Sequence, residues 1–184
     1  MGMPDTARRY TVEEVLAFPD DGNRYELVDG ELLVTPAPSP WHQLVLSRLF
    51  ARLSRYLDRH EGVEILWSPA DIRWPGESVV QPDLFVVPTA EVTRDRWSSI
   101  RTLLLAVEVI SPGSGRADRV VKRRAYQRHG VATYWAVDPD ARVVEVWRPA
   151  DERPEVVTDV LGWRVAPEAP ELVIALEELL VGSE

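Results

Sequence analysis

Glu108 is a carboxylate within an otherwise apolar stretch of the sequence. It lies in Leu103–Ile110 (LLLAVEVI), where every other side chain is apolar, as in a strand that is buried on both faces. A carboxylate in such a strand is costly unless it is protonated, paired or bound to a cation. Taken alone, a structural ion pair with an arginine explains Glu108 about as well as a functional role does.

Asp83 is the second carboxylate of this kind. It opens the apolar run DLFVV directly after Pro82, and in isolation a turn or cap residue is the simpler interpretation. If the two strands are neighbours, however, the two carboxylates converge, and they repel each other unless a cation lies between them. Oxygen ligands in a chain without cysteine favour Mg²⁺ or Mn²⁺ over zinc. We therefore predict that Asp83 and Glu108 together bind a divalent metal ion.

The segment from Arg116 to His129 follows the Glu108 strand and reads as a helix that Gly130 ends. Helical periodicity places Lys122, Tyr126 and His129 near one face. The segment carries five arginines and one acid, Asp118, and is the most basic stretch of the chain; the arginines are Arg116, Arg119, Arg123, Arg124 and Arg128. Such a run is usually a solvated helix face. Its functional interpretation is a local binding surface for phosphates, with Lys122 directed into the site.

The elements around these residues predict an α/β or α+β fold with a mixed central sheet. Thr11 and Glu14 form a capping-box pattern at the start of a first helix, and Asp29-Gly30 is a hairpin turn within Arg24–Val34. Ser39 is the expected N-cap of a second helix that runs to about Arg59. Further strands are expected at Val63–Trp67, Asp71–Trp74, Ser78–Val80, Asp83–Val87, Leu103–Ile110, Thr133–Val137 and Arg142–Trp147, with a terminal strand and helical turn at Leu172–Leu180.

The composition limits the class of protein. A chain of 184 residues suits one domain, which we expect to span residues 1–184. There is no cysteine, which excludes disulfides, thiolate zinc sites and a cysteine nucleophile. No apolar run reaches the ~18 residues of a membrane helix, and Met1–Tyr10 does not resemble a signal peptide. We therefore expect a cytoplasmic protein. The net charge of −9 argues against non-specific coating of nucleic acid by the whole surface.

Several motifs in order resemble the Uma-two family of endonucleases, which belongs to the PD-(D/E)xK nuclease superfamily. The resemblance covers roughly Tyr10 to Trp147. It is carried by Tyr25–Leu32 (YELVDGEL), Ser39–His42 (SPWH), Pro82-Asp83, Val107–Pro112 (VEVISP), Asp118-Arg119 with Lys122 and Tyr126, and Tyr134-Trp135 with Val137-Asp138. Each motif alone is weak, and their order and spacing together are fairly specific.

The resemblance implies a restriction endonuclease-like core, in which helices flank a mixed central β-sheet and an N-terminal hairpin is added. It implies a Mg²⁺- or Mn²⁺-dependent endonuclease that hydrolyses phosphodiester bonds of nucleic acid, with DNA the favoured substrate, and that works as a homodimer. Asp83, Glu108 and the backbone carbonyl of Val109 would bind the metal, and Lys122 would complete the catalytic set. The same resemblance gives supporting roles to Glu26, His42 and Tyr126. For Glu26 the other interpretation is an exposed strand acid, and for His42 a structural or surface histidine.

One position departs from the superfamily pattern. The usual lysine lies two residues after the acid, where this chain has Ile110, and a strand turns both side chains to the same face. In the Uma-two family, a lysine on the next helix takes this role, and it maps to Lys122. The alternative is a catalytically inactive module of the same fold that binds nucleic acid or protein. A hydrolase of small phosphorylated molecules is a further rival, although neither a P-loop nor an HExxH motif is present.

Overall fold

The computed structural model describes residues 8–76 and 78–181. Residues 1–7, on which the expectation of no signal peptide partly rests, lie outside this range. The first helix, α1 (Val12–Leu16), has the expected capping box: Thr11 accepts a hydrogen bond from the Glu14 backbone, and the Glu14 side chain accepts one from the Thr11 backbone.

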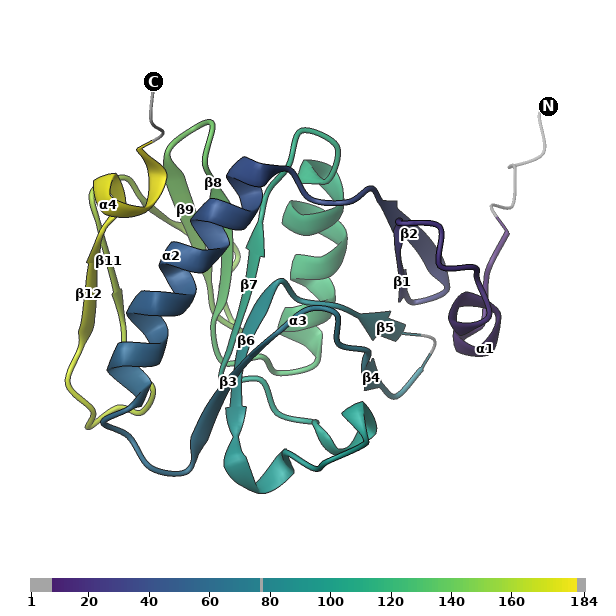
Figure 1. Ribbon diagram of the computed structural model, residues 1–184, viewed down its shortest axis with the longest axis horizontal. Helices are drawn as coiled ribbons and strands as arrows, with labels where there is room; N and C mark the ends of the chain where they lie inside the picture. Colours follow the sequence, from purple (N-terminus) through teal and green to yellow (C-terminus); the bar gives the residue numbers. More distant parts are fainter. Residues whose placement is uncertain (1–7, 77, 182–184) are drawn as a thin grey trace.

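A small antiparallel sheet forms the N-terminal part of the fold. It has the order β2-β1-β5-β4 and consists of β1 (Arg24–Val28), β2 (Glu31–Thr35), β4 (Ile72–Trp74) and β5 (Ser78–Val80). The β1–β2 turn confirms the predicted hairpin, because Asp29 and Gly30 both have positive φ, 52° and 80°. Figure 1 shows this hairpin and α1 standing at the end of the molecule opposite α4.

The central sheet is mixed, as predicted, with the order β10-β9-β8-β7-β6-β3. Its strands are β3 (Val63–Trp67), β6 (Leu84–Pro88), β7 (Leu105–Val109), β8 (Tyr134–Asp138), β9 (Val143–Trp147) and β10 (Glu155–Val157). Among the described strands, β7 and β8 are parallel and the other neighbours pair antiparallel. A parallel pair needs a crossover connection. Here it is helical, formed by a π-helical segment, η3 (Ala117–Lys122), and by α3 (Arg123–Arg128).

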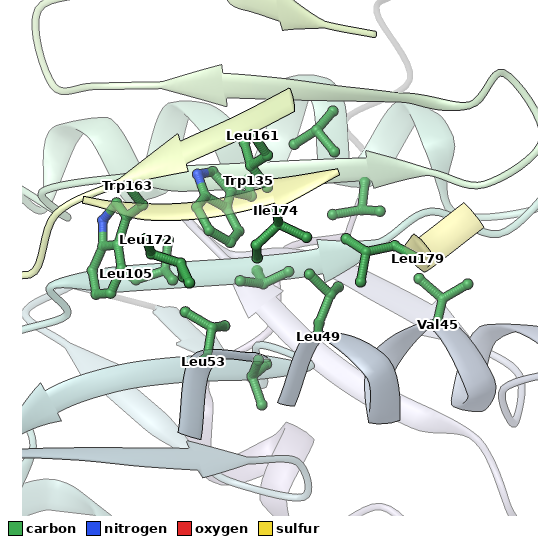
Figure 2. Close-up of a cluster of buried hydrophobic side chains, with 14 of the residues drawn as sticks. Val45, Leu49, Leu53, Leu105, Trp135, Leu161, Trp163, Leu172, Ile174 and Leu179 are labelled. Atoms are coloured by element: carbon green, nitrogen blue, oxygen red, sulfur yellow. The ribbon is translucent and has the colours of Figure 1, made fainter. Parts of the chain in front are cut away.

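The long helix α2 (Pro40–Leu57) covers one face of the central sheet. Ser39 is its N-cap, as predicted, and accepts a hydrogen bond from the His42 backbone. Figure 2 shows Leu49 and Leu53 of α2 directed toward Leu105 and Trp135 of the sheet. The cluster is closed by β11 (Val160–Trp163), β12 (Leu172–Ala175) and α4 (Leu176–Leu180).

Strand β7 separates this core from a second one. Leu105, Val107 and Val109 pack on the α2 side, whereas Ala106 and Ile110 belong to the cluster that contains Tyr126 of α3. The alternation of side chains along a strand therefore turns Glu108 toward the η3–α3 side, on the same face as Ile110. This confirms the expected orientation of Ile110, and the position of the superfamily's usual lysine is filled by apolar packing.

Three features differ from the sequence expectations. The helix expected from Arg116 contains the π-helical segment η3, which a pattern of 3.6 residues per turn does not reveal. Strand β6 begins at Leu84, so Asp83 immediately precedes the strand that we expected it to open. Two short 3₁₀ helices, η1 (Thr89–Glu91) and η2 (Trp97–Ser99), and the strands β10 and β11 were not predicted, because segments of three or four residues carry little periodic signal.

Candidate metal-binding and catalytic site

Asp83 immediately precedes β6, and Glu108 lies on the neighbouring strand β7 of the central sheet. The antiparallel register pairs Leu84 with Val107, and its continuation by one residue sets Asp83 across from Glu108. Directly opposite residues of an antiparallel pair have Cβ atoms about 5 Å apart. Both side chains are buried, and both line the same pocket of about 230 Å³. The two acids that the sequence singled out are therefore brought together.

Asp83 is fixed through both carboxylate oxygens. Its Oδ1 accepts a 2.8 Å hydrogen bond from the Arg24 guanidinium, and its Oδ2 lies 3.0 Å from Nε2 of His42. Oδ2 also accepts a 2.9 Å hydrogen bond from the Val109 backbone, which ties Asp83 to the end of β7. Burial opposes ionisation, but the hydrogen bond from His42 and the charge of Arg24 outweigh it and hold the pKa of Asp83 well below its usual range.

Glu108 is bound by two side chains from the crossover helix. Its Oε1 accepts hydrogen bonds from Tyr126 Oη at 2.6 Å and from Lys122 Nζ at 3.1 Å. Burial raises the pKa of Glu108 well above its ordinary value, because the neighbouring acids add to desolvation and the attraction of Lys122 does not cancel it. Asp83 and Glu108 are thus opposite in their tendency to ionise.

Lys122 lies among three carboxylates. Nζ is 2.6 Å from Glu26 Oε2, 3.1 Å from Glu108 Oε1 and 3.4 Å from Asp118 Oδ1. Desolvation alone would lower the pKa of Lys122, but these carboxylates raise it well above its ordinary value. Lys122 is therefore a protonated ammonium, as a buried lysine in an acidic environment should be.

Glu26 is buried rather than an exposed strand acid. Its Oε1 accepts a 2.7 Å hydrogen bond from the Gln81 backbone. Its Oε2 forms an ion pair with Lys122 but has no hydrogen-bond partner among the described residues. His42 is likewise a buried site residue rather than a surface one, and its Nδ1 has no hydrogen-bond partner in the part of the chain that the structure describes.

The sequence interpretation missed Asp118 and Arg24 as members of the site. Asp118 is buried, lines the pocket and precedes Lys122 by four residues, a spacing that sets two helical side chains side by side. Arg24 lies two residues before Glu26 on β1, and alternation along a strand turns both side chains to one face. Both signals were present in the sequence, but they acquire meaning only once Lys122 and Glu26 are known to meet.

The basic helix divides into two groups of arginines. Arg119 pairs with Asp138 at 2.5 Å and Glu145 at 2.6 Å, and Arg123 lies 4.6 Å over the Trp147 ring. These two side chains anchor the helix to the central sheet. The others, Arg116, Arg124 and Arg128, are exposed. His129, expected on the face of Lys122 and Tyr126, stacks on the Trp74 ring with 4.4 Å between ring centroids, and the same ring packs edge-on against Tyr126 at 5.7 Å.

The charges of the buried side chains at this site favour a hard divalent cation, but these side chains do not form a complete coordination shell. Four buried carboxylates, Glu26, Asp83, Glu108 and Asp118, face two permanent cations, Arg24 and Lys122. The acids outnumber these two cations by two, and because an unpaired acid is costly to bury, a divalent ion such as Mg²⁺ or Mn²⁺ would relieve the excess. Among the described residues, no three His, Asp or Glu side chains already form a metal-binding group, because Lys122 occupies the space between three of the acids. Water and main-chain oxygen would therefore have to complete the shell around Asp83 and Glu108.

None of the helices in the described part of the chain has the length and apolar character that crossing a bilayer requires.

Comparison with known proteins bears on both the fold and the family. A crystal structure from Anabaena variabilis ATCC 29413, described as a putative nuclease belonging to DUF820, superposes with a TM-score of 0.74. The match covers 93% of this chain and 97% of that chain at 20% sequence identity, so it establishes a shared fold. No curated protein gives a significant match.

The sequence also matches a family described as "Uma2: Putative restriction endonuclease" over residues 12–177. That range contains every residue of the pocket described above, from Arg24 to Lys122. With nearly the whole chain matched and the resemblance of its motifs to Uma-two confirmed, this protein belongs to the Uma2 family.

Proposed function

We propose that the protein is a metal-dependent endonuclease that hydrolyses phosphodiester bonds of nucleic acid, with DNA as the favoured substrate. The observation that carries this proposal is the meeting of Asp83, Glu108 and Lys122 at one pocket, from the residue before β6, from β7 and from the crossover helix. Membership of a family described as restriction endonucleases supports the same conclusion. A single domain spanning 1–184, a cytoplasmic location and a homodimer stay predictions.

The metal would be bound by Asp83, Glu108 and the backbone carbonyl of Val109, all of which border the pocket. When bound, Mg²⁺ or Mn²⁺ supplies a water of lowered pKa and stabilises charge on the scissile phosphate. Arg24 and His42 keep Asp83 ionised and fix its orientation. Tyr126 fixes Glu108 through its hydroxyl hydrogen bond. Two preset carboxylates reduce the reorganisation that metal binding demands.

Lys122 takes the role of the lysine that the superfamily places two residues after the acid, where this chain has Ile110. Its ammonium is surrounded by carboxylates, which favour the protonated form, so charge stabilisation suits it better than proton abstraction. A fixed cation in a desolvated pocket stabilises negative charge that develops on a phosphate more strongly than it could in water. Glu26 and Asp118 would set the position of this cation.

The first test is nicking of supercoiled DNA in Mg²⁺ or Mn²⁺ by the wild type and by Asp83→Asn, Glu108→Gln and Lys122→Met. We expect each variant to lose about 10²-fold or more in rate, the loss found when one group that stabilises a transition state is removed. Glu152→Gln, which changes an exposed acid in the loop after β9, is the matched control and should cut like the wild type. Circular dichroism verifies that each variant is folded.

A separate test does not depend on activity. Titration of Mn²⁺ followed by electron paramagnetic resonance should detect a site in the wild type that Asp83→Asn and Glu108→Gln weaken and Glu152→Gln leaves unchanged. Equal nicking by all variants, together with unchanged Mn²⁺ binding, would eliminate this site and favour the inactive binding module. The apolar Ile110 is the observation that keeps that alternative in view.

A further inference from the structure

A groove rich in arginine runs beside the candidate site. It lies between the β1–β2 turn and the crossover helix and has a volume of about 750 Å³. We call it the arginine groove and define it by the five arginines that line it: Arg8, Arg9, Arg116, Arg124 and Arg128. Asp29 and Glu31 of the hairpin are its acids, so five positive charges face two negative ones, in a protein with a net charge of −9.

The five arginines differ in how far their charge is already compensated. Arg128 pairs with Asp29 at 2.5 Å, and Arg8 pairs with Glu14 at 3.1 Å. Arg9 donates a hydrogen bond to the Asp29 carbonyl. Arg116 and Arg124 are exposed, and within residues 8–76 and 78–181 neither forms an ion pair. These two guanidinium groups are therefore available to an anionic partner.

The groove and the pocket share their walls. Asp118 and Lys122 of the crossover helix face the pocket, whereas Arg116, Val120 and Arg124 of the same helix face the groove. The β1–β2 hairpin also contributes to both sites. Its residue Glu26 pairs with Lys122 of the candidate site, and its turn lines the groove. Figure 1 shows the hairpin and the crossover helix on the same side of the molecule.

The groove has the dimensions and chemistry for one nucleic-acid strand. At the α-helical rise of about 1.5 Å per residue, the helix from Arg116 to Arg128 extends at most about 18 Å, which is at most about five nucleotides at the ~3.4 Å axial rise of a strand. Guanidinium groups bind phosphate oxygens in pairs. Between the arginines lie Val120 and Val121, and the Tyr10 ring is already covered by Arg8 at 4.6 Å. Among the described residues that line it, the groove offers phosphate contacts but no free aromatic platform and no side-chain amide that could recognise bases.

We propose that the arginine groove binds the sugar–phosphate backbone of the nucleic-acid strand that leads away from the scissile bond, independently of its sequence. This inference rests on the proposed function and explains how the polymeric substrate is held next to the catalytic site. Arg116 and Arg124 supply the principal phosphate contacts. The protein as a whole carries a net charge of −9, so the surface outside this groove repels the polyanion and confines binding to the groove.

The test measures binding without cleavage. A fluorescein-labelled 20-base-pair duplex is titrated with protein between 50 and 200 mM salt, once with EDTA and once with Ca²⁺, and anisotropy gives the affinity. The variant is Arg116→Ala/Arg124→Ala. Its matched control is Arg55→Ala/Arg153→Ala, which removes two exposed arginines outside the groove. Loss of two phosphate contacts should reduce the magnitude of the slope of log affinity against log salt by about 1.8 for this duplex.

The groove variant should also bind several unrelated duplex sequences more weakly by the same factor, while the control double variant matches the wild type. The inference is overturned if the groove variant keeps the wild-type slope, if the control loses as much, or if the wild type binds no duplex in either buffer. Tight binding of polyglutamate without binding of DNA would also overturn it, in favour of an acidic protein partner. Failure of the proposed function appears elsewhere, as unchanged DNA nicking by Asp83→Asn.

Discussion

Lys122 Nζ lies 2.6 Å from Glu26 Oε2, an ion pair that joins the crossover helix of the central sheet to the N-terminal hairpin. Both side chains are buried. The hairpin strand β1 belongs to the small sheet, so the lysine of the candidate site also connects the small sheet to the central one. The position of Lys122 therefore depends on the N-terminal hairpin as well as on its own helix.

This arrangement predicts a strong energetic coupling between the two residues. Lys122→Met leaves three buried carboxylates without their cation, which should lower the free energy of unfolding by about 3–5 kcal/mol. Glu26→Gln in the same background removes one of the uncompensated charges and should restore part of the loss. Urea denaturation of the two single variants and the double variant gives the coupling as a double-mutant cycle. Strictly additive effects would contradict a direct interaction between Lys122 and Glu26.

A second prediction concerns the hydroxyl of Tyr126, which donates a 2.6 Å hydrogen bond to Glu108 Oε1. Tyr126→Phe should destabilise the protein by about 1–3 kcal/mol, the cost of removing the donor from a buried acceptor. Tyr134→Phe is the matched control: this buried tyrosine donates a 3.2 Å hydrogen bond to the Asp118 carbonyl, a neutral acceptor, and should cost about 1 kcal/mol. Thermal unfolding compares the two, and a larger cost for Tyr134→Phe would refute the ranking.

The sequence predicted most of the elements that position the site, because the signals for them are local. The capping box at Thr11, the Asp29-Gly30 turn and the Ser39 N-cap each depend on neighbouring residues and all occur in the structure. The apolar run around Glu108 indicated a doubly buried strand for the same reason. The predicted pairing of Asp83 with Glu108 is a longer-range inference, and it followed from the cost of burying two carboxylates.

The family resemblance gave site roles to Glu26, His42, Lys122 and Tyr126, but the contacts among them could not be predicted from local signals, because they depend on where the hairpin docks. Nothing near Glu26 in the sequence indicates that it meets Lys122, and the fixation of Asp83 by Arg24 follows from the same docking. The π-helical segment that carries Asp118 and Lys122 is also a product of tertiary packing rather than of periodicity. The division of the arginines into anchoring and exposed groups has the same origin, since it requires the positions of Asp138 and Glu145.

A third prediction uses the turn between β8 and β9. Asp138 accepts hydrogen bonds from the Asp140 and Ala141 backbones and pairs with Arg119. Burial alone would raise its pKa, but the Ala141 hydrogen bond and Arg119 together lower the pKa of Asp138 below its ordinary value. A lowered folded-state pKa stabilises the protein above the unfolded value of about 3.9 and loses that effect as the pH falls through the folded value.

Asp138→Asn should therefore reduce the melting temperature at pH 7, and the difference from the wild type should shrink below about pH 4. Asp140→Asn is the matched control, because Asp140 is exposed in the same turn. Its melting temperature should follow that of the wild type at both pH values. A difference between Asp138→Asn and the wild type that persists unchanged in acid would show that the ionised carboxylate is not the stabilising form.

A fourth prediction tests whether Lys122 substitutes for the lysine that the superfamily places at position 110. Ile110 turns to the same side as Glu108 and packs in the cluster that contains Tyr126. A lysine at this position would follow Glu108 by two residues on one face of the strand, so its flexible stem can carry the ammonium toward Glu108. The single variant Ile110→Lys adds a cation where Lys122 already compensates the acids and replaces half-buried apolar packing, so it should lower stability without raising the nicking rate.

The double variant Ile110→Lys/Lys122→Met tests whether a lysine beside Glu108 is sufficient even when it comes from position 110 instead of position 122. If the role of Lys122 is to supply a cation beside Glu108, the double variant should nick DNA faster than Lys122→Met alone in Mg²⁺ or Mn²⁺. Ile110→Met/Lys122→Met is the matched control, since it alters packing at the same position without adding charge. Equal rates for the two double variants, with both folded by circular dichroism, would mean that the cation must come from the crossover helix, where Glu26 and Asp118 fix its position.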